Sequence, residues 1–164
     1  MMNQELLYKS YDRPLAVIAS SSNTEGHCLA KKFAENGYDI IIAARNPSVV
    51  EEAQEFKALG IDAVSFQLDL STKAGIEQLY SRIVATGRPV EALIINSGIS
   101  VDLTNETELA RKVLKDMVGT GSGRILFAGI DDNDQKIMTR ACKEIKKQAE
   151  GSRVTVDALQ PGNH

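Results

Sequence analysis

The stretch VIASSSNTEGHCLAKKFAENGYDIIIAARN, residues 17–46, decides the fold. It begins with an apolar run, passes through a polar turn into a segment of helical periodicity, and returns to a second apolar run. Leu29, Ala30 and Phe33 are spaced so that they share one face of a helix. The stretch therefore predicts a buried strand, an amphipathic helix and a second buried strand.

The same alternation continues along the rest of the chain. Short apolar runs predict six strands, at residues 15–19, 39–43, 63–67, 92–96, 124–128 and 154–158. The segments between them have helical periodicity. Because strands and helices that alternate with short, right-handed connections form one sheet covered on both faces, we expect an α/β fold, a doubly wound parallel sheet of the Rossmann type with strand order 3-2-1-4-5-6. We expect residues 1–164 to form a single domain, with residues 1–13 as an N-terminal extension.

The composition narrows the expected partners. A net charge of −3 and a pI near 5.5 provide no basic field for a phosphate backbone or an anionic lipid surface, so we expect neither nucleic acid nor membrane as a partner. The beginning of the chain does not match a signal peptide. Cys28 and Cys142 fall at apolar positions and indicate a reducing, cytoplasmic location, and the few cysteines and histidines predict no metal site.

Five segments, in order, resemble the short-chain dehydrogenase/reductase family. They are the opening stretch, LDLS at 68–71, INSG at 95–98, GRILFAG at 123–129 and VTVDALQPG at 154–162. Each lies at the carboxyl end of a predicted strand or runs through one. The resemblance implies an oxidoreductase-like Rossmann domain that binds NAD(P)(H) where the carboxyl ends of the strands meet.

The phosphate-binding turn of that family, TGxxxGxG, is retained only in part. When Gly26 is aligned with the third glycine, Ser20 takes the place of the first and Thr24 that of the second. Because Ser and Thr tolerate a positive φ poorly, the turn is expected to differ in shape. The resemblance implies cofactor binding by Ser20, Ser22, Thr24 and Gly26. The alternative is a polar loop that only caps the following helix.

Arg45, at the end of the second predicted strand, indicates which dinucleotide is preferred. In the family, an acid near this position binds the ribose hydroxyls of NAD, whereas a guanidinium can bind the 2′-phosphate of NADP. The resemblance therefore implies NADP(H), while NAD(H) stays open. A solvated surface arginine is the alternative.

The motifs after the third and fourth strands add the remaining candidates for cofactor binding. By resemblance, Asp69 and Leu70 lie beside the adenine; alternatively, Asp69 helps Ser71 to cap the next helix. By the same resemblance, the motif at 96–98 braces the sheet and leaves room beside the cofactor. Its members are Asn96, Ser97 and Gly98.

The residues that the family uses for proton transfer are not found where the resemblance would place them. The family uses a Tyr, a Lys four residues later and a Ser, whereas this sequence has tyrosines only at positions 8, 11, 38 and 80, all before the fifth predicted strand. We therefore assign no catalytic residue and expect a pseudoenzyme with impaired or absent dehydrogenase activity and a doubtful carbonyl or alcohol substrate. An active NADP(H)-dependent enzyme with an unconventional acid, or a non-enzymatic interaction module, is the alternative.

Two segments are shorter than in the family. By the resemblance, the helix between Gly98 and Gly123 corresponds to the later half of the family's helix, and the helix at 136–149 to the part that follows the family's catalytic Lys. We also expect truncation before the family's seventh strand. These shortened helices and the edge of the sixth strand are the surfaces through which we expect any pairing of two copies.

Overall fold

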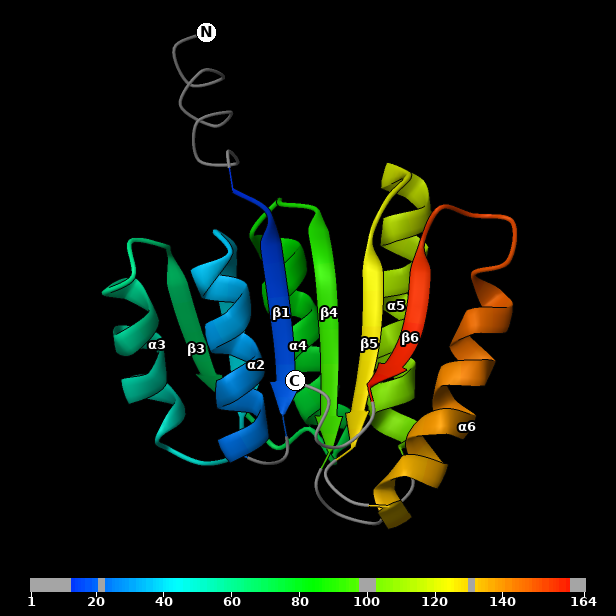
Figure 1. The fold of residues 1–164 in the computed structure, drawn as a ribbon, viewed down its shortest axis with the longest axis horizontal. Coiled ribbons are helices and arrows are strands. Elements are labelled where there is room, and N and C mark those ends of the chain that lie inside the picture. Colours follow the sequence, from blue (N-terminus) through cyan, green and yellow to red (C-terminus); the bar gives the residue numbers. More distant parts are fainter. Residues whose placement is uncertain (1–12, 21–22, 98–102, 130–131, 160–164) are drawn as a thin grey trace, which may run out of the picture.

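The computed structural model describes residues 13–20, 23–97, 103–129 and 132–159. These residues form a six-stranded sheet with the order β3-β2-β1-β4-β5-β6, and every neighbouring pair of strands is parallel. Figure 1 shows the strands side by side with helices on both faces. The predicted fold class and strand order are confirmed.

The elements follow one another as the periodicity predicts. Their bounds are β1 Leu15–Ser20, α2 Asn23–Glu35, β2 Asp39–Ala44, α3 Val49–Lys57, β3 Ala63–Gln67, α4 Lys73–Ala85, β4 Val90–Ser97, α5 Thr104–Thr120, β5 Arg124–Gly129, α6 Asp132–Gln148 and β6 Thr155–Leu159. Each predicted strand coincides with an observed strand. No helix in these described ranges is both long and apolar enough to cross a membrane.

Two apolar cores lie on opposite faces of the sheet. Helices α2 and α3 cover one face, where Ile18 and Phe56 are fully buried. Helices α4, α5 and α6 cover the other, where Leu79, Leu109 and Phe127 are fully buried. Burial of each such side chain contributes about 1.5–3 kcal/mol, which explains why continuous apolar runs form the central strands.

A buried ion pair lies at the amino edge of the sheet. Asp39, the first residue of β2, is 2% exposed. Its Oδ2 lies 3.0 Å from Nη2 of Arg88, and its Oδ1 accepts a hydrogen bond of 2.9 Å from the backbone N–H of Asp62. The pair ties the start of β2 to the loops before β3 and β4.

Candidate functional site

The candidate residues meet at the carboxyl edge of the central strands. Ser20 ends β1 and pairs in register with Ala44 of β2 on one side and with Asn96 of β4 on the other. Arg45 follows directly after β2. Because the sheet continues outward from β1 in both directions, this is the point where the strand order reverses and where ligands bind in open α/β sheets.

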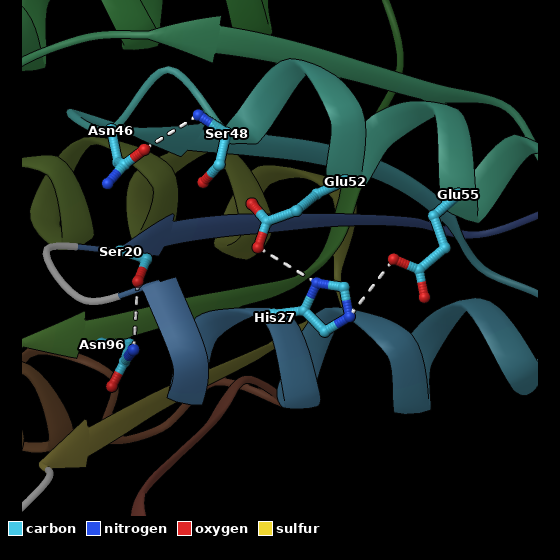
Figure 2. A network of polar contacts seen from close by, with 7 residues as sticks. All are labelled: Ser20, His27, Asn46, Ser48, Glu52, Glu55 and Asn96. Carbon is cyan, nitrogen blue, oxygen red and sulfur yellow. Dashed lines mark hydrogen bonds and ion pairs between the residues drawn. The ribbon is translucent and has the colours of Figure 1, made fainter.

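Asn96 is the centre of a buried network at this edge. Its side chain is 2% exposed and lies 3.1 Å from the hydroxyl of Ser20, as Figure 2 shows. The Asn96 amide is assigned the orientation in which both its oxygen and its nitrogen have hydrogen-bond partners. In this orientation Oδ1 accepts hydrogen bonds from Ser20 Oγ at 3.1 Å and from the Gly26 backbone N–H at 3.0 Å. In that orientation Nδ2 donates to the Ala128 carbonyl at 3.1 Å. One amide therefore joins β1, α2, β4 and β5.

Gly26 packs directly against the end of β1. A Cβ at this position would lie 2.7 Å from Ser20 Cβ and closer still to Ser20 Oγ. Any side chain would therefore push the first turns of α2 away from the sheet. This close approach is the role that the family pattern assigns to the third glycine.

The two positions without the family's glycines do not require glycine in this structure. No non-glycine residue in the described part of the chain has a positive φ, and Ser20 belongs to β1. The backbone of Thr24 belongs to the first turn of α2. The turn therefore reaches the helix without a left-handed conformation at position 20 or 24. Ser22 and Gly98 lie outside the described residues, as do the side chains of Thr24 and Ser97.

Arg45 and Asp69 carry opposite charges at neighbouring strand ends. Arg45 is exposed and precedes a tight turn in which Asn46 Oδ1 accepts a 2.9 Å hydrogen bond from the Ser48 backbone N–H (Figure 2). Hydrogen bonds from the hydroxyl and then the backbone N–H of Ser71 lower the pKa of Asp69, and the positive charge of Arg45 lowers it further. Arg45 is therefore close enough to interact with Asp69 and is open to an anionic ligand.

Asp69 organises the turn between β3 and α4. Its Oδ1 accepts hydrogen bonds from Ser71 Oγ at 2.6 Å and from Ser71 N at 3.0 Å. Thr72, not Ser71 as the sequence suggested, caps α4, because its hydroxyl accepts the 3.0 Å hydrogen bond from the Gly75 N–H. Ser71 Oγ is directed to Asp69 instead. The side chain of Leu70 is buried in the core with α4.

A histidine that sequence reasoning did not single out connects α2 and α3. His27 Nδ1 lies 3.0 Å from Glu52 Oε1, and Nε2 lies 3.4 Å from Glu55 Oε2 (Figure 2). Burial raises the pKa of Glu52, while the hydrogen bond and the charge of His27 oppose that rise. The i,i+3 spacing of the two glutamates on one helix was the available signal, but their partner comes from another helix.

The two described tyrosines lie away from the carboxyl edge. Tyr38 precedes β2 at the amino edge and contacts Phe33 with a centroid distance of 5.0 Å. Tyr80 lies on α4, where its hydroxyl donates a 2.8 Å hydrogen bond to Asp116 of α5. Burial, and then Asp116, raise the pKa of Tyr80. Neither phenol is placed to exchange a proton with a ligand at the ends of β1, β2 and β4.

The known proteins that this chain resembles are dehydrogenases and reductases. The family model described as short chain dehydrogenase matches residues 14–132. The NADP-dependent 3-hydroxy acid dehydrogenase YdfG of Salmonella typhi is 22% identical over 113 residues, which cover 69% of this chain and 45% of that protein. The diacetyl reductase of Staphylococcus epidermidis is 26% identical over 145 residues, covering 88% of this chain and 53% of that protein. The chain thus spans about half the length of the curated relatives it matches.

Solved structures have the same fold at low sequence identity. The L-sorbose reductase of Gluconobacter frateurii, in complex with NADPH and L-sorbose, superposes with a TM-score of 0.80 at 18% identity and covers 92% of this chain and 69% of its own. An NAD+-bound xylitol dehydrogenase gives a TM-score of 0.78 at 14% identity, covering 92% of this chain and 70% of its own.

Proposed function

This chain belongs to the short-chain dehydrogenase family, and on that premise we propose that it binds NADP(H) at the carboxyl ends of β1, β2 and β4. The observation that supports this most directly is the contact of Gly26 with Ser20, which brings the beginning of α2 against the centre of that edge. A dinucleotide's pyrophosphate would lie at the beginning of α2. Its adenosine ribose would lie toward Arg45.

The groups at this edge suit the chemistry of a dinucleotide. The first N–H groups of a helix lack partners within the helix, and the helix dipole adds partial positive charge, so the beginning of α2 favours a diphosphate. The absence of a side chain at Gly26 keeps this helix end close to the sheet. The carboxylate of Asp69 and the guanidinium of Arg45, which interact electrostatically, would lie on the adenosine side. We infer that the residues fit the cofactor.

The preference for NADP(H) over NAD(H) rests on Arg45. Its exposed guanidinium can form paired hydrogen bonds with a 2′-phosphate, an interaction that NADH cannot provide. The relatives differ among themselves: YdfG is named NADP-dependent, whereas the xylitol dehydrogenase was solved with NAD+. The preference for NADP(H) is therefore inferred from Arg45 and not from the similarity to these relatives.

We further propose that binding is accompanied by little or no carbonyl reduction. The bound cofactor would supply a hydride, but reduction also needs a proton donor, and an unperturbed phenol or ammonium is a poor acid–base group without a suitable partner. Both described tyrosines lie elsewhere, and no tyrosine follows β5 in the sequence. The substrate classes named for the relatives, hydroxy acids and small ketones, are the ones to test.

Titration of the pure protein with NADPH tests the binding proposal. We expect enhanced NADPH fluorescence and a raised melting temperature, with a weaker response to NADH. Control reactions follow cofactor absorbance with diacetyl plus NADPH and with a 3-hydroxy acid plus NADP+. No fluorescence or melting response at millimolar NADPH contradicts the binding proposal, and steady oxidation of NADPH or reduction of NADP+ by contaminant-free protein contradicts the proposed loss of activity.

We also propose a cytoplasmic location, because both thiols are unpaired. Cys28 is exposed and Cys142 is buried, and burial raises the pKa of the Cys142 thiol. An unpaired exposed thiol suits a reducing compartment. Fractionation of cells that express the full protein, with an antibody as the probe, tests the location.

A further inference from the structure

We propose that Ser20 is a positioning residue: its hydroxyl and the Asn96 amide set the place of the first turns of α2 against the sheet. The consequence for cofactor affinity rests on the proposed NADP(H) site. The positioning itself is a property of the protein without ligand. A serine therefore takes over a position where the family pattern has a turn glycine.

Ser20 and Gly26 are in close steric contact. Ser20 is 2% exposed, and its side chain fills the space that a Cβ on Gly26 would occupy. The next nearest described atom to such a Cβ is the Asn96 amide atom that faces Ser20 and Gly26, which is Oδ1 in the orientation given above, at 3.4 Å, an ordinary contact distance. Among the described residues, the obstacle at position 26 is thus Ser20. The two positions are complementary in size: the side chain of Ser20 fits because Gly26 has none.

Hydrogen bonds also join Ser20, Asn96 and Gly26. Asn96 Oδ1 accepts from both the Ser20 hydroxyl and the Gly26 N–H, and Nδ2 is bound to the Ala128 carbonyl of β5. Because these three hydrogen bonds hold both the oxygen and the nitrogen of the buried Asn96 amide, the orientation of the amide is fixed. Loss of the serine hydroxyl leaves the amide oxygen with the Gly26 N–H as its remaining partner in this network. The first turns of α2 are then less firmly held.

The same network affects the N–H groups at the start of α2 that a cofactor's pyrophosphate would meet. Because the Gly26 N–H donates to Asn96, the N–H groups of α2 that remain for a pyrophosphate are those of its first three residues, 23–25. Their direction depends on where α2 is held. A displacement of about 1 Å weakens charge-assisted hydrogen bonds markedly, since these depend steeply on distance and angle.

The first experiment uses hydrogen exchange of the ligand-free protein, followed residue by residue by NMR. We expect Ser20→Ala to speed exchange of the Gly26 N–H at least about fivefold, in line with the loss of one buried hydrogen bond. Amides of α5, on the other face of the sheet, should be unchanged. The exposed Ser81→Ala, on α4, is the matched control and should change neither region.

The second experiment is a steric double-mutant cycle. Gly26→Ala should lower the melting temperature strongly. Adding Ser20→Gly to this variant should recover most of that loss, because the new methyl group at position 26 then occupies the space left by the removed side chain at position 20. If Gly26→Ala does not fold, recovery of a folded protein by the double variant gives the same answer.

The third experiment separates positioning from general stability. Ser20→Ala should weaken NADPH binding about tenfold, yet leave the binding of adenosine 2′-monophosphate, which lacks the pyrophosphate, unchanged. Unchanged Gly26 exchange in Ser20→Ala, or no recovery in the double variant, overturns the inference. If the wild-type protein binds no NADPH, the proposed function fails, while the exchange and melting results still decide the role of Ser20.

Discussion

Arg45 is the single side chain on which the proposed preference for NADP(H) depends. Arg45→Ala should weaken NADPH binding about tenfold, since a charged hydrogen bond contributes about 1.5–3 kcal/mol, and should leave NADH binding unchanged. Parallel fluorescence titrations with the two cofactors measure this. Arg45→Lys, which keeps the charge but not the paired geometry, should fall between wild type and alanine. Equal losses for both cofactors would show that Arg45 does not contact the 2′-phosphate.

Asp39 allows a test of stability at the edge opposite the site. Asp39→Ala removes one partner of a buried pair and leaves Arg88, whose side chain is 14% exposed, without its carboxylate. We expect a loss of about 3 kcal/mol or more in the free energy of unfolding, measured by urea denaturation. Because the pair lies at the amino edge, the NADPH affinity of the folded variant should stay at the wild-type value. A stability within error of wild type would contradict this account.

At the scale of elements, the contact between α2 and α3 makes stability depend on pH. The folded-state pKa of Glu52 is raised by burial, so the stability linked to this carboxyl is fully present below its unfolded pKa and is lost as pH rises through the folded value. Glu52→Gln cannot ionise. The unfolding free energy of the variant relative to wild type should therefore increase as pH rises from about 4.5 through the folded pKa.

Glu55→Gln is the matched control for this pH dependence. Glu55 faces the other nitrogen of His27 but is half exposed. Urea denaturation of wild type and both variants between pH 4 and 8 compares the two carboxyls. A pH-independent difference between Glu52→Gln and wild type, or an equal slope for Glu55→Gln, would count against a burial effect at Glu52.

At the scale of the whole molecule, a ligand bound only to the folded state must stabilise it. NADPH at about 100 times its Kd should add about 2.7 kcal/mol. For a domain of this size that corresponds to a rise in melting temperature of about 5–10 °C. Differential scanning fluorimetry over a range of NADPH concentrations measures the rise. A melting temperature that does not change with concentration would contradict binding to the folded state.

The fold could be predicted from the sequence because its signals are local. Apolar runs such as Ile40–Ile42 and helical stripes such as Leu109–Val113 appear directly in the order of residues, and alternating strands and helices have few ways to pack. Part of the candidate site followed as well. Ser20, Arg45 and Asn96 each come at a strand end, and parallel strands bring their carboxyl ends to one edge.

Other features depended on the tertiary structure. Ser20 and Asn96 are 76 positions apart, and His27 and Glu52 are 25 apart, so their contacts exist only because the sheet order places β1 beside β4 and the chain places α3 beside α2. The missing glycines could not be judged from the sequence, since whether position 20 needs a positive φ depends on the path of the turn. Periodicity along the chain thus determined the elements and their order, while distances between side chains from different elements determined what Gly26 and Ser20 do, because packing is a property of neighbours in space.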